Sequence, residues 1–95
     1  MFAAVTRINV RPGSLDETLA LEKALGTSPH AVERLTLVDP ETNTLTVIAI
    51  VDDEAAARTW GETDHGRAVI AQLPRITDQP VQRSVHRVHR HVRRG

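Results

Sequence analysis

Hydrophobic and polar residues recur along this chain with spacings that divide it into six elements. A strand-like run over residues 2–11 is followed by residues 14–25, which have the spacing of an amphipathic helix. Two more strand-like runs form a hairpin over residues 32–51, a second helical stretch covers residues 53–73, and a last strand-like run covers residues 81–92. The order β-α-β-β-α-β predicts an α+β, ferredoxin-like fold with one antiparallel sheet.

A sheet of this kind carries its helices on one face and leaves the other face bare. The run Leu45–Val51 is apolar on both of its sides, as expected of a central strand that is covered from two directions. In the first strand one side is apolar, and the other is mixed and carries Ala3, Val5, Arg7, Asn9 and Arg11. We therefore expect a partner or a ligand to cover the face that the helices leave free.

The helix boundaries carry clear local signals. Ser14 to Glu17 has the S-x-x-E form of a capping box, and Gly26 is expected to end the first helix. Two glycines, Gly61 and Gly66, interrupt the second helical stretch, so we predict two pieces. The second piece should start at a fresh N-cap, Thr63 or Asp64, and end at Pro74.

The last strand departs from strict alternation. Val81 and Val85 share one side, whereas Val88 and Val92 occupy the other. Either a bulge lies near His86 and Arg87, or only part of the run is paired.

Length and composition exclude several classes of protein. The 95 residues are expected to form a single domain, 1–95, with a core of Val, Ile, Leu and Ala, because Phe2 and Trp60 are the only aromatic residues. The absence of Cys excludes disulfides, thiol nucleophiles and Cys-based zinc sites. The longest apolar run, Val47–Val51, is far too short to span a bilayer. We expect a soluble, cytoplasmic protein.

Charge is unevenly distributed, although the formal net charge is zero. All twelve acidic residues lie at or before Asp78, whereas the segment 81–95 is basic and carries Arg83, Arg87, Arg90, Arg93 and Arg94. Such a segment can bind nucleic acid or an acidic partner. We favour pairing with an acidic surface of the same chain or of a second copy, because the segment is short and has no interleaved aromatic residues. Nucleic-acid binding is the third hypothesis.

Two other kinds of chemistry fit poorly. His86, His89 and His91 invite a metal site, but on a strand His86 opposes the other two and no nearby carboxylate completes a ligand set. We therefore expect no metal. The chain also lacks a G-x-S-x-G turn and a Gly-rich phosphate loop, so hydrolases and nucleotide enzymes are disfavoured.

Several segments combine into a family pattern. They are Arg11-Pro12-Gly13, the hairpin Val38–Asn43, the helical run Asp53–Trp60, Thr63-Asp64-His65 and Leu73-Pro74. Over nearly the whole domain the chain resembles the antibiotic biosynthesis monooxygenase group of the dimeric α+β barrel superfamily. Within the helical match, Trp60 occupies the family's first His position and His65 matches the second.

The chain also departs from the family pattern. Members often carry a Trp near the end of the third strand, where this chain has Ile50-Val51-Asp52. In the haem-degrading branch an Asn on the first strand takes part in the site, and the matching position here is Thr6. Haem degradation is therefore disfavoured.

The resemblance implies a homodimer whose sheets pack face to face, with a pocket in each subunit between the sheet and its helices. Family enzymes of this kind oxidise polycyclic aromatic or quinol-type substrates with O2 and need no cofactor. The protein would bind the substrate, accept its proton and shield the resulting anion from water. The alternative is a non-catalytic dimeric ligand-binding or interaction module of the same fold.

Four residues are candidates for the site. His65 is the best candidate for a catalytic base, because an imidazole accepts protons near neutral pH, although a capping or surface histidine is the plainer interpretation. Trp60 could form the wall of a pocket for a planar substrate, or simply fill the core. Arg7 and Asn9 lie on one side of the first strand and could orient a phenolate or carboxylate, or instead make polar contacts across the dimer or with water.

Overall fold

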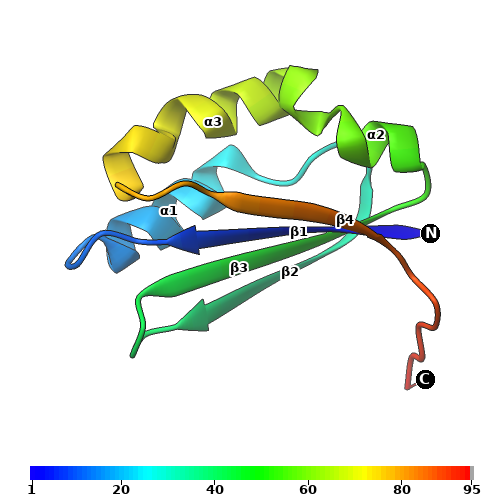
Figure 1. The fold of residues 1–95 in the computed structure, drawn as a ribbon, viewed down its shortest axis with the longest axis horizontal. Coiled ribbons are helices and arrows are strands. Elements are labelled where there is room, and N and C mark those ends of the chain that lie inside the picture. The colour runs from blue at the N-terminus through cyan, green and yellow to red at the C-terminus, as the bar shows by residue number, and fades with distance from the viewer. Residues whose placement is uncertain (95) are drawn as a thin grey trace.

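The predicted order of elements is found in the computed structural model, which describes residues 1–94. The strands are β1 (Phe2–Asn9), β2 (Ala31–Asp39), β3 (Thr44–Val51) and β4 (Gln82–Arg87). The helices are α1 (Leu15–Leu25), α2 (Glu54–Arg58), a single 3-10 turn η1 (Trp60–Glu62) and α3 (Asp64–Ile76). All strand pairs are antiparallel, the order across the sheet is β2-β3-β1-β4, and the helices lie on one face (Figure 1). The α+β, ferredoxin-like class is confirmed.

The side-chain alternation of β1 and β3 places the core between the sheet and the helices. Ile8 and Leu45 are paired across these strands, point toward the helices, and are 5% and 2% exposed. They form the main core with Val10 and Ile76, and Leu15 and Leu19 of α1 pack against it. The opposite face of the sheet receives the intervening side chains, including Leu35 and Leu37 of β2, which are each 48% exposed.

The first helix has the predicted range, but the predicted capping box is wrong. The backbone of Ser14 is not extended (φ −105°, ψ 8°), and its hydroxyl makes no capping hydrogen bond. An extended N-cap is what normally brings that hydroxyl over the free N–H groups of the first turn. Instead, the Ser14 carbonyl accepts from Thr18 N and Thr18 Oγ1, at 2.9 and 2.7 Å. Gly26 ends the helix with a positive φ of 69°, as predicted.

The second helical stretch is divided as predicted. Thr63 is the N-cap of α3, and its Oγ1 accepts from Gly66 N at 3.0 Å. The predicted end at Pro74 is wrong, because α3 continues to Ile76 and Thr77 N still donates to Leu73 O at 3.0 Å. A proline inside a helix loses one backbone hydrogen bond and crowds the carbonyl four residues before it, but burial of Ile76 in the core holds the last turn in place.

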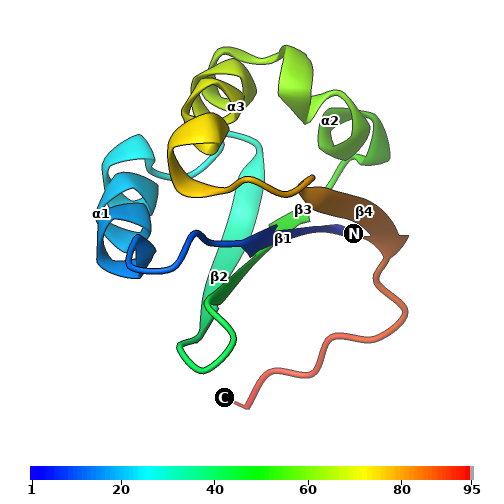
Figure 2. The same ribbon diagram turned by 60° about the vertical axis from the view of Figure 1, so that its left-hand side comes forward.

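Only part of the last predicted strand is paired. β4 ends at Arg87, so the second of the two alternatives for this run is confirmed. Val88 N donates to Met1 O at 3.0 Å, and the chain then passes over the sheet face that carries no helices (Figure 2). There Arg93 Nη2 lies 2.9 Å from Glu33 Oε2, which is the expected pairing of the basic segment with an acidic group of its own chain.

Candidate functional site

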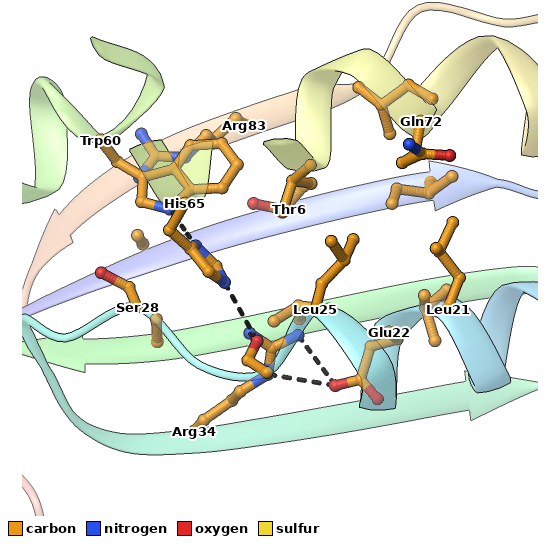
Figure 3. Close-up of a pocket in the computed structure, with 18 of the residues that line it drawn as sticks. Thr6, Leu21, Glu22, Leu25, Ser28, Arg34, Trp60, His65, Gln72 and Arg83 are labelled. Atoms are coloured by element: carbon orange, nitrogen blue, oxygen red, sulfur yellow. Dashed lines mark hydrogen bonds and ion pairs between the residues drawn. The ribbon is translucent and has the colours of Figure 1, made fainter. Parts of the chain in front are cut away.

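A cavity of about 100 Å³ lies between the sheet and the helices. Its apolar walls come from the strands and from α1, α2 and α3, and include Ala4, Ile8, Leu21, Leu45, Val69 and Leu73. Polar side chains also line the cavity, among them Thr6, Glu22, Arg34, Trp60, His65, Gln72 and Arg83 (Figure 3). An apolar chamber with a few convergent polar groups is typical of small-molecule sites.

The break between η1 and α3 brings Trp60 and His65 together. Thr63 Oγ1 donates to Trp60 O at 2.6 Å and accepts from Gly66 N, so one threonine joins the two helical pieces. Gly66 is buried against this turn, and a Cβ there would overlap the carbonyl of Trp60. The local sequence Thr63–Gly66 therefore fixes where the indole and the imidazole lie.

The two rings are hydrogen-bonded to each other. Trp60 Nε1 donates to His65 Nδ1 at 3.0 Å, and the rings are edge-on with their centroids 5.9 Å apart. The other ring nitrogen, Nε2 of His65, lies 3.1 Å from Gly26 O. A carbonyl only accepts, so the geometry assigns a neutral imidazole with its proton on Nε2. The lone pair that a catalytic base needs is on Nδ1 and is occupied by the Trp60 N–H.

Arg83 is a site residue that the sequence did not single out. It projects from β4 beside Thr6, donates from Nη2 to Ala57 O at 2.7 Å, and its guanidinium carbon lies 5.0 Å from the centroid of the Trp60 ring. Burial lowers the pKa of its guanidinium. No carboxylate within residues 1–94 forms an ion pair with it. A half-buried cation of this kind favours an anionic ligand group.

A signal for Arg83 was present in the sequence. It lies midway between Val81 and Val85, on the apolar side of the last strand. A lone charged residue on a side that is otherwise apolar is costly to bury unless it meets a partner. This position therefore marks Arg83 as a functional candidate.

The opposite end of the cavity is electrically neutral. Glu22 Oε1 accepts from Arg34 Nε, Arg34 Nη2 and Thr36 Oγ1 at 3.1, 2.8 and 2.8 Å. Arg34 Nη1 also donates to Gly26 O at 3.2 Å, the same carbonyl that His65 contacts. The cavity thus has a paired cation on β2 and an unpaired one on β4.

Arg7 and Asn9 do not join the other two predicted site residues. Side chains alternate along β1, so Thr6 and Ile8 line the cavity, while Arg7 and Asn9 point to the face without helices. Trp60 and His65 are therefore brought together in the cavity, whereas Arg7 and Asn9 do not line it.

Two histidines of the C-terminal segment, His86 and His91, contact different partners. His86 Nε2 lies 2.8 Å from Ser84 Oγ, and His91 Nε2 lies 3.6 Å from Glu33 Oε2. Across residues 1–94 no group of three histidine or carboxylate side chains is placed to hold a metal ion. In the same range, no helix has both the length and the apolar character required to cross a membrane.

Comparison with known proteins yields solved structures alone. No family model matches the sequence, and no curated protein matches it. Rv0793 from Mycobacterium tuberculosis is 16% identical, with a TM-score of 0.79 over 97% of this chain and 98% of that one. A crystal structure described as antibiotic biosynthesis monooxygenase is 17% identical, with a TM-score of 0.76 over 93% and 98%. An uncharacterised NIPSNAP domain protein from Burkholderia xenovorans is 14% identical, with a TM-score of 0.72 over 99% and 100%. The chain shares the fold of these proteins.

Proposed function

We propose that this protein binds a planar, largely apolar molecule in the cavity and oxidises it with O2 as a cofactor-independent monooxygenase. The observation that carries the proposal is the convergence of three groups on an apolar chamber: the Trp60 indole, the His65 imidazole and the unpaired Arg83 guanidinium. The fold is also that of a structure described as an antibiotic biosynthesis monooxygenase.

The proposed chemistry uses a substrate whose acidic CH2 group is conjugated with a ketone across an aromatic ring system, as in anthrone. Transfer of that proton to His65 Nδ1 leaves an enolate, whose oxygen Arg83 stabilises in a water-poor site. The electron-rich carbon then reacts with O2, so that the CH2 group becomes C=O and the second oxygen atom leaves as water. The substrate itself supplies the electrons, and Trp60 must first release Nδ1 of His65.

We also propose that the protein is a cytoplasmic homodimer formed through the sheet faces that carry no helices. Leu35 and Leu37 expose nearly half of their surface there, and Ile48 of the neighbouring strand lies between them and β1. Burying such side chains stabilises an interface by about 25 cal/mol per Å² of apolar surface. The remaining groups on this face, including Arg7 and Asn9, would then contact the second copy.

A non-catalytic ligand-binding module is the second candidate, and one observation favours it. Both ring nitrogens of His65 are engaged in hydrogen bonds, one with Trp60 and one with Gly26. A histidine held in this way stabilises the cavity wall without accepting a proton.

Anthrone oxidation in air-saturated buffer separates the two candidates. We expect wild-type protein to accelerate anthraquinone formation over buffer, and His65→Ala to reduce that acceleration at least about tenfold, since general base catalysis contributes about 10²–10⁴. His89→Ala, in the exposed C-terminal segment, is the matched control. If wild type and His65→Ala are equally inert while an anthrone analogue still binds, the module is correct, and if nothing binds, both candidates fail.

A further inference from the structure

A second hollow adjoins the cavity. It is a groove of about 300 Å³ between α3 and β4, and Ile70 and Val81 contribute to its walls. Six residues line both spaces: Thr6, Ile8, Trp60, Val69, Leu73 and Arg83. A single layer of side chains therefore separates the groove from the cavity, and Trp60 with Arg83 stacked on it forms its polar part (Figure 3).

The size of the cavity makes the groove relevant to ligand binding. Pockets for small organic molecules usually measure about 300–1,000 Å³. The inner cavity of about 100 Å³ lies below that range, whereas the groove of about 300 Å³ reaches it. A ligand of two or three fused rings is accommodated only if it extends from the cavity into the groove past Trp60.

The charges of the two spaces differ. The carboxylate that lines the inner cavity, Glu22, is bonded to Arg34. The groove is lined by two arginines, Arg58 and Arg83, and by no acidic residue among positions 1–94. Arg58 does pair with Glu54 at 2.9 Å, but both side chains are about half exposed, and such surface pairs contribute only about 0–1 kcal/mol. Arg58 is therefore free to turn toward an anion.

We propose that the groove is a second subsite, which holds an anionic substituent of the ligand between Arg58 and Arg83. The preferred ligand is then a planar ring system with an acidic group, such as a carboxylate or sulfonate, at one end. The ring system extends from the cavity into the groove, where its acidic group lies, while Trp60 turns aside and exchanges its bond to His65 for contact with the rings. This inference rests on the proposed ring-binding function of the cavity and adds the class of substrate.

A matched pair of ligands tests the subsite. Anthraquinone-2-sulfonate carries the anion, and 2-(hydroxymethyl)anthraquinone has a similar shape without the charge. Because Trp60 is the only tryptophan of the chain, quenching of its fluorescence reports binding of each. We expect the sulfonate to bind about tenfold more tightly, a difference of about 1.4 kcal/mol. Arg58→Gln should remove most of that preference and leave the affinity for the neutral ligand unchanged.

Arg67→Gln is the control, since Arg67 is an exposed arginine of α3 that pairs with Asp64 and does not line the groove. Equal affinities for the two ligands would overturn the subsite and leave ring binding intact. A sulfonate preference that persists in Arg58→Gln would place the anion elsewhere and would also overturn it. If neither ligand quenches Trp60, the ring-binding function fails and the inference fails with it.

Discussion

At the scale of single residues, the site depends on how closely two helical pieces approach. A Cβ on Gly66 would lie 2.7 Å from the carbonyl carbon of Trp60 and 2.9 Å from the Cα of Gly61. Backbone atoms cannot move aside as the end of a flexible side chain can. Glycine at this position therefore lets η1 pack on the first turn of α3, which places the Trp60 N–H against His65.

Gly66→Ala should lower the free energy of unfolding by about 2–3 kcal/mol, because overpacking against backbone forces η1 and α3 apart. Urea denaturation followed by Trp60 fluorescence measures this. Gly61→Ala is the matched control, since its Cβ would meet only Ile70 Cδ1 at 3.4 Å, an ordinary contact. Equal stability of the two variants would contradict the close approach.

At the scale of elements, the end of α3 is fastened to the chain that follows β1. Arg11 N donates to Ile76 O at 2.7 Å, and Thr77 Oγ1 donates to Asn9 O at 2.6 Å. The Arg11 side chain donates to Arg75 O and binds Asp78, which follows the helix. These contacts hold one end of the helix layer against the sheet.

The Arg11–Asp78 pair should make stability depend on pH. The hydrogen bond from Arg11 lowers the pKa of Asp78, so the pair stabilises the fold above the unfolded pKa of about 4, and this contribution is lost as the pH falls through the folded pKa. Asp78→Asn should therefore be less stable than wild type at pH 7, and the difference should be smaller at pH 3. Urea denaturation at both pH values checks this, with Asp52→Asn as an exposed control. A difference as large at pH 3 as at pH 7 would exclude the charge as its cause.

At the scale of the whole molecule, the face of the sheet without helices is covered unevenly. Near Glu33 the C-terminal segment lies over it, and Ile50, paired with Glu33, is 9% exposed. Farther along β2, Leu35 and Leu37 are each 48% exposed. The part left bare by the segment is the part on which the proposed dimer depends.

Leu35→Lys should dissociate the proposed homodimer, because a charge would be buried in an apolar contact without a partner. Sedimentation at micromolar concentration should give a dimer for wild type and a monomer for this variant. Ile70→Lys changes a residue of similar exposure, 47%, on the helix layer and should remain a dimer. A monomeric wild type would refute the shared interface.

The amino-acid sequence by itself determined the order of elements and the end of α1 at Gly26. It also determined the break in the second helical stretch, after which Thr63 is the N-cap of α3. These features depend on spacing and on neighbours a few residues away, which a sequence displays directly. It also placed Trp60 and His65 close together in the chain at that break, where the structure joins them by a hydrogen bond.

Only the tertiary structure decided where α3 ends, how α1 begins and which residue meets Trp60. Pro74 stays inside α3 because Ile76 is buried by distant strands, and the Ser14 cap fails because its backbone is not extended. Arg83 reaches Trp60 only after β4 pairs with β1, a contact between residues more than twenty positions apart. Such contacts depend on which elements become neighbours in space, and a local pattern of residues does not show which elements these are.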